Sequence, residues 1–192
     1  MKKLYIIIIV SFYLLSCKSP TDSTTATPTT SILPLSVGNL WVMQRSYYDT
    51  LGNITSTFQD TIKITGETTV QGVTYSVMLD SYALIFCINR NEGLYALWGD
   101  NKEYLLLKYP ASSGDYYSNP STNMTVVATD TLISVPKGNF HCYHYSLLNT
   151  SGINYPVNDY YSPGIGYVQI EVNYSHTPKI FVRSKLVDYS IK

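Results

Sequence analysis

NDYYSPGIGYVQIE, residues Asn158 to Glu171, joins two tyrosine-rich and apolar runs through a Pro-Gly turn. Pro163 fixes a φ angle suited to a turn, and Gly164 and Gly166 have the backbone freedom that a sharp reversal requires. The residues that follow alternate between apolar and polar, as in a half-buried β-strand. A G-x-G-x-x-G nucleotide motif would need a third glycine and a following helix, but Gln169 occupies that glycine position. The stretch therefore predicts a β-hairpin and argues against a phosphate-binding loop.

The same period-2 alternation continues along the chain outside this hairpin. FQDTIKIT (58–65) and VTYSVMLDS (73–81) each separate an apolar face from a polar one, as antiparallel strands with one buried face do. Turn signals that combine Gly with Asn, Asp or Pro separate the runs at intervals of about eight to twelve residues. The sequence predicts an all-β, single antiparallel domain of about 10–12 strands. A sheet that long must curl, split or close, so we expect a strongly curved sheet, a half-barrel or a sandwich.

The N-terminus has the features of an export signal. In MKKLYIIIIVSFYLLSC, two lysines precede an apolar run of about a dozen residues, which is too short to span a bilayer permanently. The run ends in Leu14–Cys17, LLSC, which resembles the bacterial lipobox. The resemblance implies that residues 1–16 are a lipoprotein signal peptide and that Cys17 is acylated and becomes the mature N-terminus. The alternative is an ordinary secretory signal with an incidental cysteine.

The residues after Cys17 predict where the protein is held. Lys18 occupies the position at which aspartate retains many Gram-negative lipoproteins in the inner membrane, so we expect lipid anchoring to the outer membrane. The sequence leaves open whether the protein faces the periplasm or the cell surface. Thr, Ser and Pro dominate the following segment, which has too few apolar groups to fold. We therefore expect a lipidated cysteine and tether over 17–34 and the β domain over 35–192.

Composition and motifs favour a non-catalytic protein. The chain has 13 basic and 13 acidic residues, so no basic surface for nucleic acid is expected. His141 and His144 lie in a strand-like run at an odd spacing, which places them on opposite faces and disfavours a shared metal site. Cys142 and His144 share a face, but without an adjoining oxyanion-type turn they indicate core packing. No common hydrolase, protease or nucleotide-binding motif is present. We expect neither enzyme activity nor a cofactor or metal.

Two cysteines remain after Cys17. An exported protein permits a disulfide between Cys87 and Cys142, which would close a long loop. Both cysteines also lie in apolar, strand-like runs, where a free thiol packs as a small core residue. The sequence leaves these two alternatives open.

Tyrosine is unusually abundant, with 19 residues in the chain. The tyrosine ring is flat and apolar with a polar tip, and it serves either as a binding platform or as a sheet-stabilising core residue. The candidate ligand-contact residues are Tyr116 and Tyr117, in the long loop SSGDYYSNPS (112–121). Packing within the sheet is the alternative for the tyrosines as a class.

Three short motifs resemble an uncharacterised group of bacterial envelope lipoproteins. They are V-G-N-x-W within PLSVGNLWVM (34–43), G-x-F within VPKGNFHCYHY (135–145), and Y-Y-x-P-G-[IV]-G within the hairpin described above. They occur in the order typical of that group and are spread over nearly the whole predicted domain. The resemblance implies an all-β exported domain without an assigned reaction, and it supplies no catalytic residue.

These observations lead to a functional hypothesis with alternatives. We expect a non-catalytic outer-membrane lipoprotein whose β domain binds an apolar ligand or another envelope protein. A surface glycan-binding module that uses tyrosines with Trp41 or Trp98 is one alternative, and a structural envelope scaffold is another. An interior cavity lined by aromatic residues would support the first hypothesis, and an exposed planar row would support the glycan module.

Overall fold

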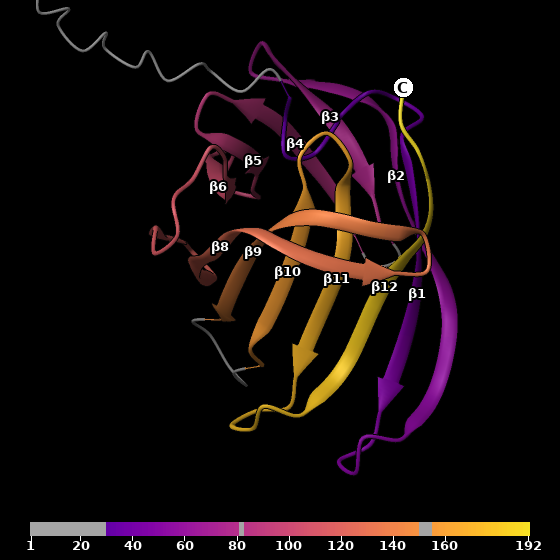
Figure 1. Ribbon diagram of the computed structural model, residues 1–192. Coiled ribbons are helices and arrows are strands. Elements are labelled where there is room, and N and C mark those ends of the chain that lie inside the picture. Colours follow the sequence, from indigo (N-terminus) through magenta and orange to yellow (C-terminus); the bar gives the residue numbers. More distant parts are fainter. Residues whose placement is uncertain (1–29, 81–82, 150–154) are drawn as a thin grey trace, which may run out of the picture.

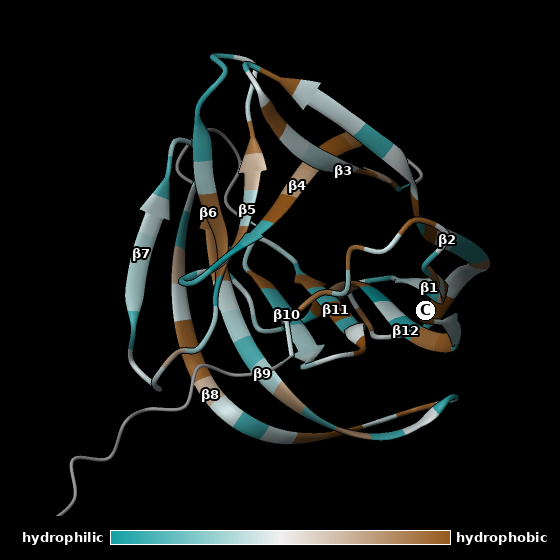
Figure 2. Cartoon of the chain, turned by 90° about the horizontal axis from the view of Figure 1, so that it is seen from above, coloured by the Kyte–Doolittle hydropathy of each residue, from teal (hydrophilic) through white to brown (hydrophobic). Residues whose placement is uncertain are grey.

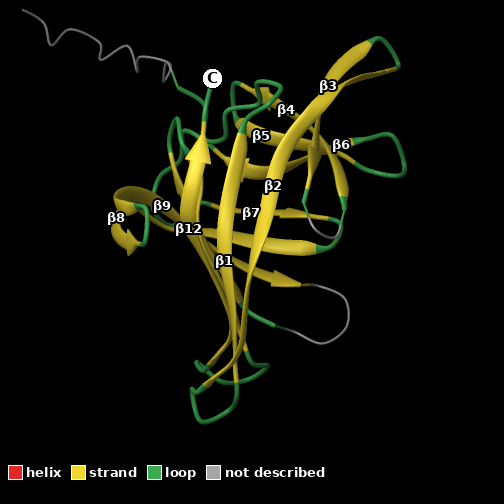
Figure 3. Ribbon diagram, turned by 90° about the vertical axis from the view of Figure 1, so that its right-hand side faces the viewer, coloured by secondary structure: helices red, strands yellow, loops and turns green. Residues whose placement is uncertain are grey.

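The computed structural model describes residues 30–80, 83–149 and 155–192. These residues form twelve β-strands and no helix (Figures 1 and 3). The strands are β1 (Leu40–Tyr48), β2 (Ile54–Val70), β3 (Val73–Leu79), β4 (Leu84–Arg90), β5 (Gly93–Leu97), β6 (Glu103–Lys108), β7 (Tyr116–Asn119), β8 (Thr122–Val135), β9 (Gly138–Asn149), β10 (Val157–Ser162), β11 (Gly166–Asn173) and β12 (Ile180–Ser190). The all-β prediction is confirmed. The expected lipidation site, Cys17, lies outside the described residues.

All twelve strands belong to one antiparallel sheet that curls into a nearly closed barrel. Its order is β6-β5-β4-β3-β2-β1-β12-β11-β10-β9-β8-β7, so every neighbour in the sheet except the β1–β12 pair is also a neighbour in sequence. Seen from above, the strands are arranged in a ring (Figure 2). The first and last strands pair with each other, and the two edge strands, β6 and β7, come from the middle of the chain. The structure is therefore the strongly curved sheet of the prediction.

Side chains replace the missing ladder where β6 and β7 meet, a place we call the seam. The Tyr117 hydroxyl accepts a hydrogen bond from Lys108 N and donates one to Leu106 O, each at 3.1 Å. The Tyr145 hydroxyl donates to Lys108 O at 2.8 Å. Both tyrosines thus satisfy backbone groups of an edge strand that has no strand partner on that side. The seam is held by a few side-chain contacts, which are easier to open than a continuous ladder.

The core extends further toward the N-terminus than the sequence indicates. Ile32 and Leu33 are buried among the core residues, and Asn89 Nδ2 donates to Leu33 O at 3.0 Å. Gly164 N donates to Ser31 O at 2.8 Å. The core therefore begins at Ile32, three residues before the expected start of the domain at Leu35, because two apolar residues beside a Thr/Ser-rich segment form no strand period.

The Pro-Gly turn between β10 and β11 is confirmed. Ile165 N donates to Ser162 O at 3.0 Å, and Gly164 and Gly166 have φ angles of 77° and 95°. The Trp41 indole donates to Ile165 O at 2.6 Å. The V-G-N-x-W and P-G-I-G motifs therefore contact each other in space, because the tryptophan of one satisfies the turn carbonyl of the other.

The long β8–β9 hairpin lies across β10, β11 and β12 (Figure 1). Its turn is attached to the last strand, since Lys137 N donates to Leu186 O at 3.2 Å and Lys137 Nζ lies 2.5 Å from Asp188 Oδ1. Phe140 packs edge-on against Tyr189, with ring centroids 6.3 Å apart. The hairpin therefore covers one face of these three strands.

Candidate ligand-binding site

A cavity of about 150 Å³ lies in the barrel next to the seam and is partly open. Strands from both sides of the seam contribute to it, together with the turn between β7 and β8. Its lining residues are Leu94, Trp98, Leu106, Leu107, Asn119, Ser121, Thr122, Met124, Leu147, Asp159, Tyr161 and Tyr167. Most of these side chains are aliphatic or aromatic, and the polar ones are few. This composition is typical of sites for small organic ligands.

Asp159 is the one acidic side chain in the lining of this cavity. Alternation along β10 places Val157, Asp159 and Tyr161 on the same face, so the carboxyl occupies a position that the pattern assigns to an inward residue. It is buried, and within the described part of the chain its Oδ1 has no hydrogen-bond partner. Burial raises the pKa of the Asp159 carboxyl to about 7 because the charged form loses its hydration.

The aromatic groups near Asp159 are neutral at physiological pH. Tyr161 and Tyr167 line the cavity with ring centroids 4.8 Å apart, and the Tyr167 hydroxyl donates to Met78 Sδ at 3.7 Å. Burial raises the pKa of both phenols above the ordinary value of 10.0. Among the side chains that line the cavity, Asp159 is consequently the one whose charge changes in the neutral range.

The candidate ligand-contact tyrosines have different positions. Tyr116 is 65% exposed and points away from the core. Tyr117 is directed to the seam, where it makes the hydrogen bonds described above. Neither lines the cavity, but Asn119 and Ser121 from the same predicted loop do. The loop is therefore near the site, and its contribution comes from residues that the sequence did not single out.

The two tryptophans point inward. Trp41 is fully buried in the core, and Trp98 lines the cavity. Among the described tyrosines and tryptophans, Tyr116 alone has a largely exposed side chain. The described residues thus lack the exposed aromatic row that the glycan-binding alternative requires.

The disulfide considered from the sequence is not formed. Cys87 and Cys142 are free thiols, and both are buried, on β4 and β9. Burial raises the pKa of each thiol to about 12, which leaves both protonated and unreactive at neutral pH. Their role in the structure is packing, the second of the two alternatives.

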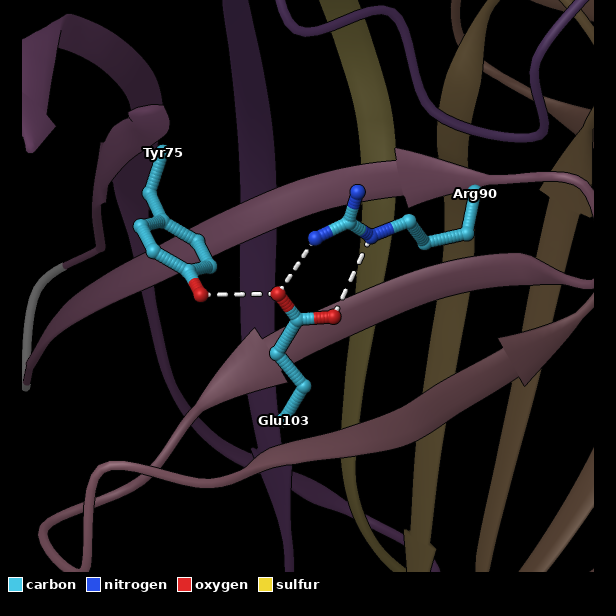
Figure 4. Close-up of polar contacts among 3 residues, drawn as sticks. All are labelled: Tyr75, Arg90 and Glu103. Atoms are coloured by element: carbon cyan, nitrogen blue, oxygen red, sulfur yellow. Dashed lines mark hydrogen bonds and ion pairs between the residues drawn. The ribbon is translucent and has the colours of Figure 1, made fainter. Parts of the chain in front are cut away.

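A second polar group lies beside an open groove at the start of β6 (Figure 4). Arg90 forms a two-point contact with Glu103, with Nε–Oε2 and Nη2–Oε1 distances of 3.1 and 2.5 Å, and the Tyr75 hydroxyl donates to Glu103 Oε1 at 2.7 Å. Arg90 and Tyr75 hold the pKa of Glu103 below its ordinary value. Because both carboxylate oxygens are occupied, this group links β3, β4 and β6 and has little capacity left for a ligand.

Over residues 30–80, 83–149 and 155–192, no three His, Cys, Asp or Glu side chains gather as a metal site would require. The same residues include no helix with the length and apolar character needed to cross a bilayer.

Asp159 is the site residue that the sequence analysis did not identify. A signal was present, because V-N-D-Y-Y (157–161) alternates and the aspartate stands between two apolar positions of one face. A charged residue at an inward position is uncommon unless it is paired or functional. The alternation by itself predicts only the end of a strand at this place.

Comparison with known proteins shows the fold alone. A crystal structure of a Bacteroides fragilis protein, described as exported and as having a YmcC-like fold, matches with a TM-score of 0.52 and 15% identity, covering 84% of this chain and 99% of that one. A Parabacteroides distasonis protein described as a lipoprotein matches with a TM-score of 0.51 and 16% identity over the same shares of the two chains. No protein-family model and no curated protein matches the chain. The chain therefore has the same fold as these two bacterial proteins.

Proposed function

We propose that this protein is a non-catalytic, lipid-anchored protein of the outer membrane whose barrel binds a small apolar ligand in the cavity beside the seam. The observation that carries the proposal is the cavity itself, which combines an apolar and aromatic lining with one buried carboxyl. A volume of about 150 Å³ equals that of an engineered protein cavity that binds benzene. The ligand, or the part of it that enters, is therefore about the size of one aromatic ring.

The route into the cavity is the seam. Leu106 and Leu107 of β6 line one wall, and Asn119 and Ser121, at the end of β7 and in the turn after it, line another. A movement of β7 away from β6 would break the two Tyr117 hydrogen bonds and no strand ladder. The position of the cavity supports ligand entry from the side of the barrel.

The proposed membrane anchor is supported by the LLSC motif at Leu14–Cys17 and by the structural neighbours described as an exported protein and as a lipoprotein. In the Cys17→Ser variant, we expect the protein to move from the membrane fraction to the soluble fraction of the envelope, because the acceptor thiol is lost. The control is Ser19→Ala, outside the motif. Metabolic labelling with a fatty-acid analogue measures the modification directly, and equal labelling of Cys17→Ser and wild type would contradict the anchor.

Ligand binding in the cavity is tested by filling the cavity with a larger side chain. In the Leu106→Trp variant, the larger side chain is expected to occupy the apolar space, so that binding of benzene or toluene, followed by NMR chemical-shift changes of cavity residues, falls at least about tenfold. Leu148→Trp is the matched control, because Leu148 is exposed and does not line the cavity. Absence of saturable binding to the wild-type protein would disprove the proposed function.

A further inference from the structure

We infer that the ligand of this cavity carries a protonated amine next to its apolar part and that the carboxylate of Asp159 is the counter-ion of that amine. This inference rests on the proposed function and specifies the chemical class of the ligand. It begins from a contrast between Asp159 and the other shielded carboxylates of the molecule.

The other shielded carboxylates each have an arginine. Asp60, which is buried, lies 2.5 Å from the guanidinium of Arg45. Glu171 accepts a hydrogen bond from Arg183 Nε at 2.6 Å. Asp159 is also buried, yet none of the ion pairs among the described residues includes it. Asp60 and Glu171 are thus each paired with an arginine, whereas Asp159, at the wall of the cavity, is in none of these ion pairs.

The cavity cannot provide that cation from its own lining. Its residues are aliphatic, aromatic or neutral polar, and Asp159 is the only ionisable group there besides the two tyrosines, which stay neutral. An unpaired carboxylate in such surroundings is costly, and a cation that reaches it recovers much of the lost interaction. A ligand that brings its own positive charge is therefore selected over a neutral ligand of the same shape.

The aromatic lining favours the same class of ligand. Trp98, Tyr161 and Tyr167 all border the space that the ligand would fill. The faces of aromatic rings attract cations electrostatically, most strongly for tryptophan, and they also pack well against an apolar body. One carboxylate with several ring faces is an arrangement suited to an organic ammonium group. An anionic ligand would meet repulsion from Asp159 and would find no donor with a positive charge.

The test measures how tightly three probes of nearly equal size bind the wild-type protein at pH 8. The affinities are measured by isothermal titration calorimetry and NMR titration. Benzylamine carries a protonated amine at this pH, benzyl alcohol offers a neutral donor, and toluene offers neither. We expect benzylamine to bind at least about tenfold more tightly than the other two, as for a charged hydrogen bond in a shielded site. In the Asp159→Asn variant this preference should disappear, so that benzylamine binds no more tightly than toluene.

The outcomes separate this inference from the proposed function. If toluene and benzylamine bind the wild type equally, the cavity takes apolar ligands and the inference is wrong. If benzyl alcohol binds as tightly as benzylamine, a neutral donor suffices and the cation is not required, which also overturns it. If none of the three binds, the proposed function itself fails. The comparison within the wild type does not depend on the folding of the variant.

Discussion

Between pH 4 and pH 8, the wild-type protein is expected to lose roughly 3–4 kcal/mol of unfolding free energy that the Asp159→Asn variant keeps. The cause is the buried carboxyl, whose pKa rises from the ordinary value of 3.8 to about 7 in the folded protein. Between these two values the folded state holds a proton that the unfolded state has released. Stability therefore falls as the pH rises through this window and levels off above pH 7.

The measurement is urea denaturation of both proteins at several pH values, with the difference in unfolding free energy plotted against pH. Asp130→Asn is the control, because it removes the carboxylate of an exposed side chain beside His141, outside the cavity. A flat difference between wild type and Asp159→Asn across the window would show that the carboxyl is solvated or paired in solution, and the site as described would be wrong.

The second large effect is expected at the Pro-Gly turn. In the Gly166→Ala variant, the unfolding free energy should fall by roughly 2–4 kcal/mol, the combined result of backbone strain and overpacking. Gly166 has a φ of 95°, and an added Cβ would lie 2.5 Å from Leu33 Cδ1 and 3.1 Å from the Trp41 ring. The methyl group would push apart the N-terminal segment, the first strand and the turn.

The Gly72→Ala variant is the control that separates backbone strain from the steric contacts of an added Cβ. Gly72 also has a positive φ, 80°, but nothing lies within 4 Å of the position of its Cβ. This control should lose only about 1 kcal/mol. Chemical denaturation of both variants measures the difference, and equal losses would mean that the contacts among Gly166, Leu33 and Trp41 add no packing constraint.

Local pattern was sufficient to predict most of the fold. Alternation in residues such as those of β2 and β3, with Gly-containing turns between them, predicts an antiparallel meander, and a sheet of this length has to curl. Closure was not predictable in the same way. The pairing of Trp41 with Tyr189 and the seam at Tyr117 depend on contacts between distant residues, which no local period encodes. The start of the core at Ile32 is not predictable for a related reason, since two apolar residues form no period.

The site was less accessible to sequence reasoning than the fold. Trp98 and residues 112–121 are binding candidates from the sequence, and both border the cavity, but the sequence predicts an exposed aromatic platform there rather than a cavity wall. Asp159 is not predictable as a site residue, because a single carboxyl in an alternating run can be either a core charge with a partner or a group that binds a ligand. The sequence alone does not distinguish the two. Only the structure shows that none of the ion pairs among the described residues includes Asp159, whereas Asp60 pairs with Arg45.

The pairing of β1 with β12 has a consequence for folding during synthesis. The ribosome delivers β1 first and β12 last, so β1 cannot complete its pairing until nearly the whole chain is available. Until then, the partly assembled sheet has an unpaired edge at β1, the kind of edge to which other extended chains add. Premature truncation at any point before Ile180 leaves that edge permanently open. The full-length chain should therefore be far less prone to aggregate than any of its partly synthesised intermediates.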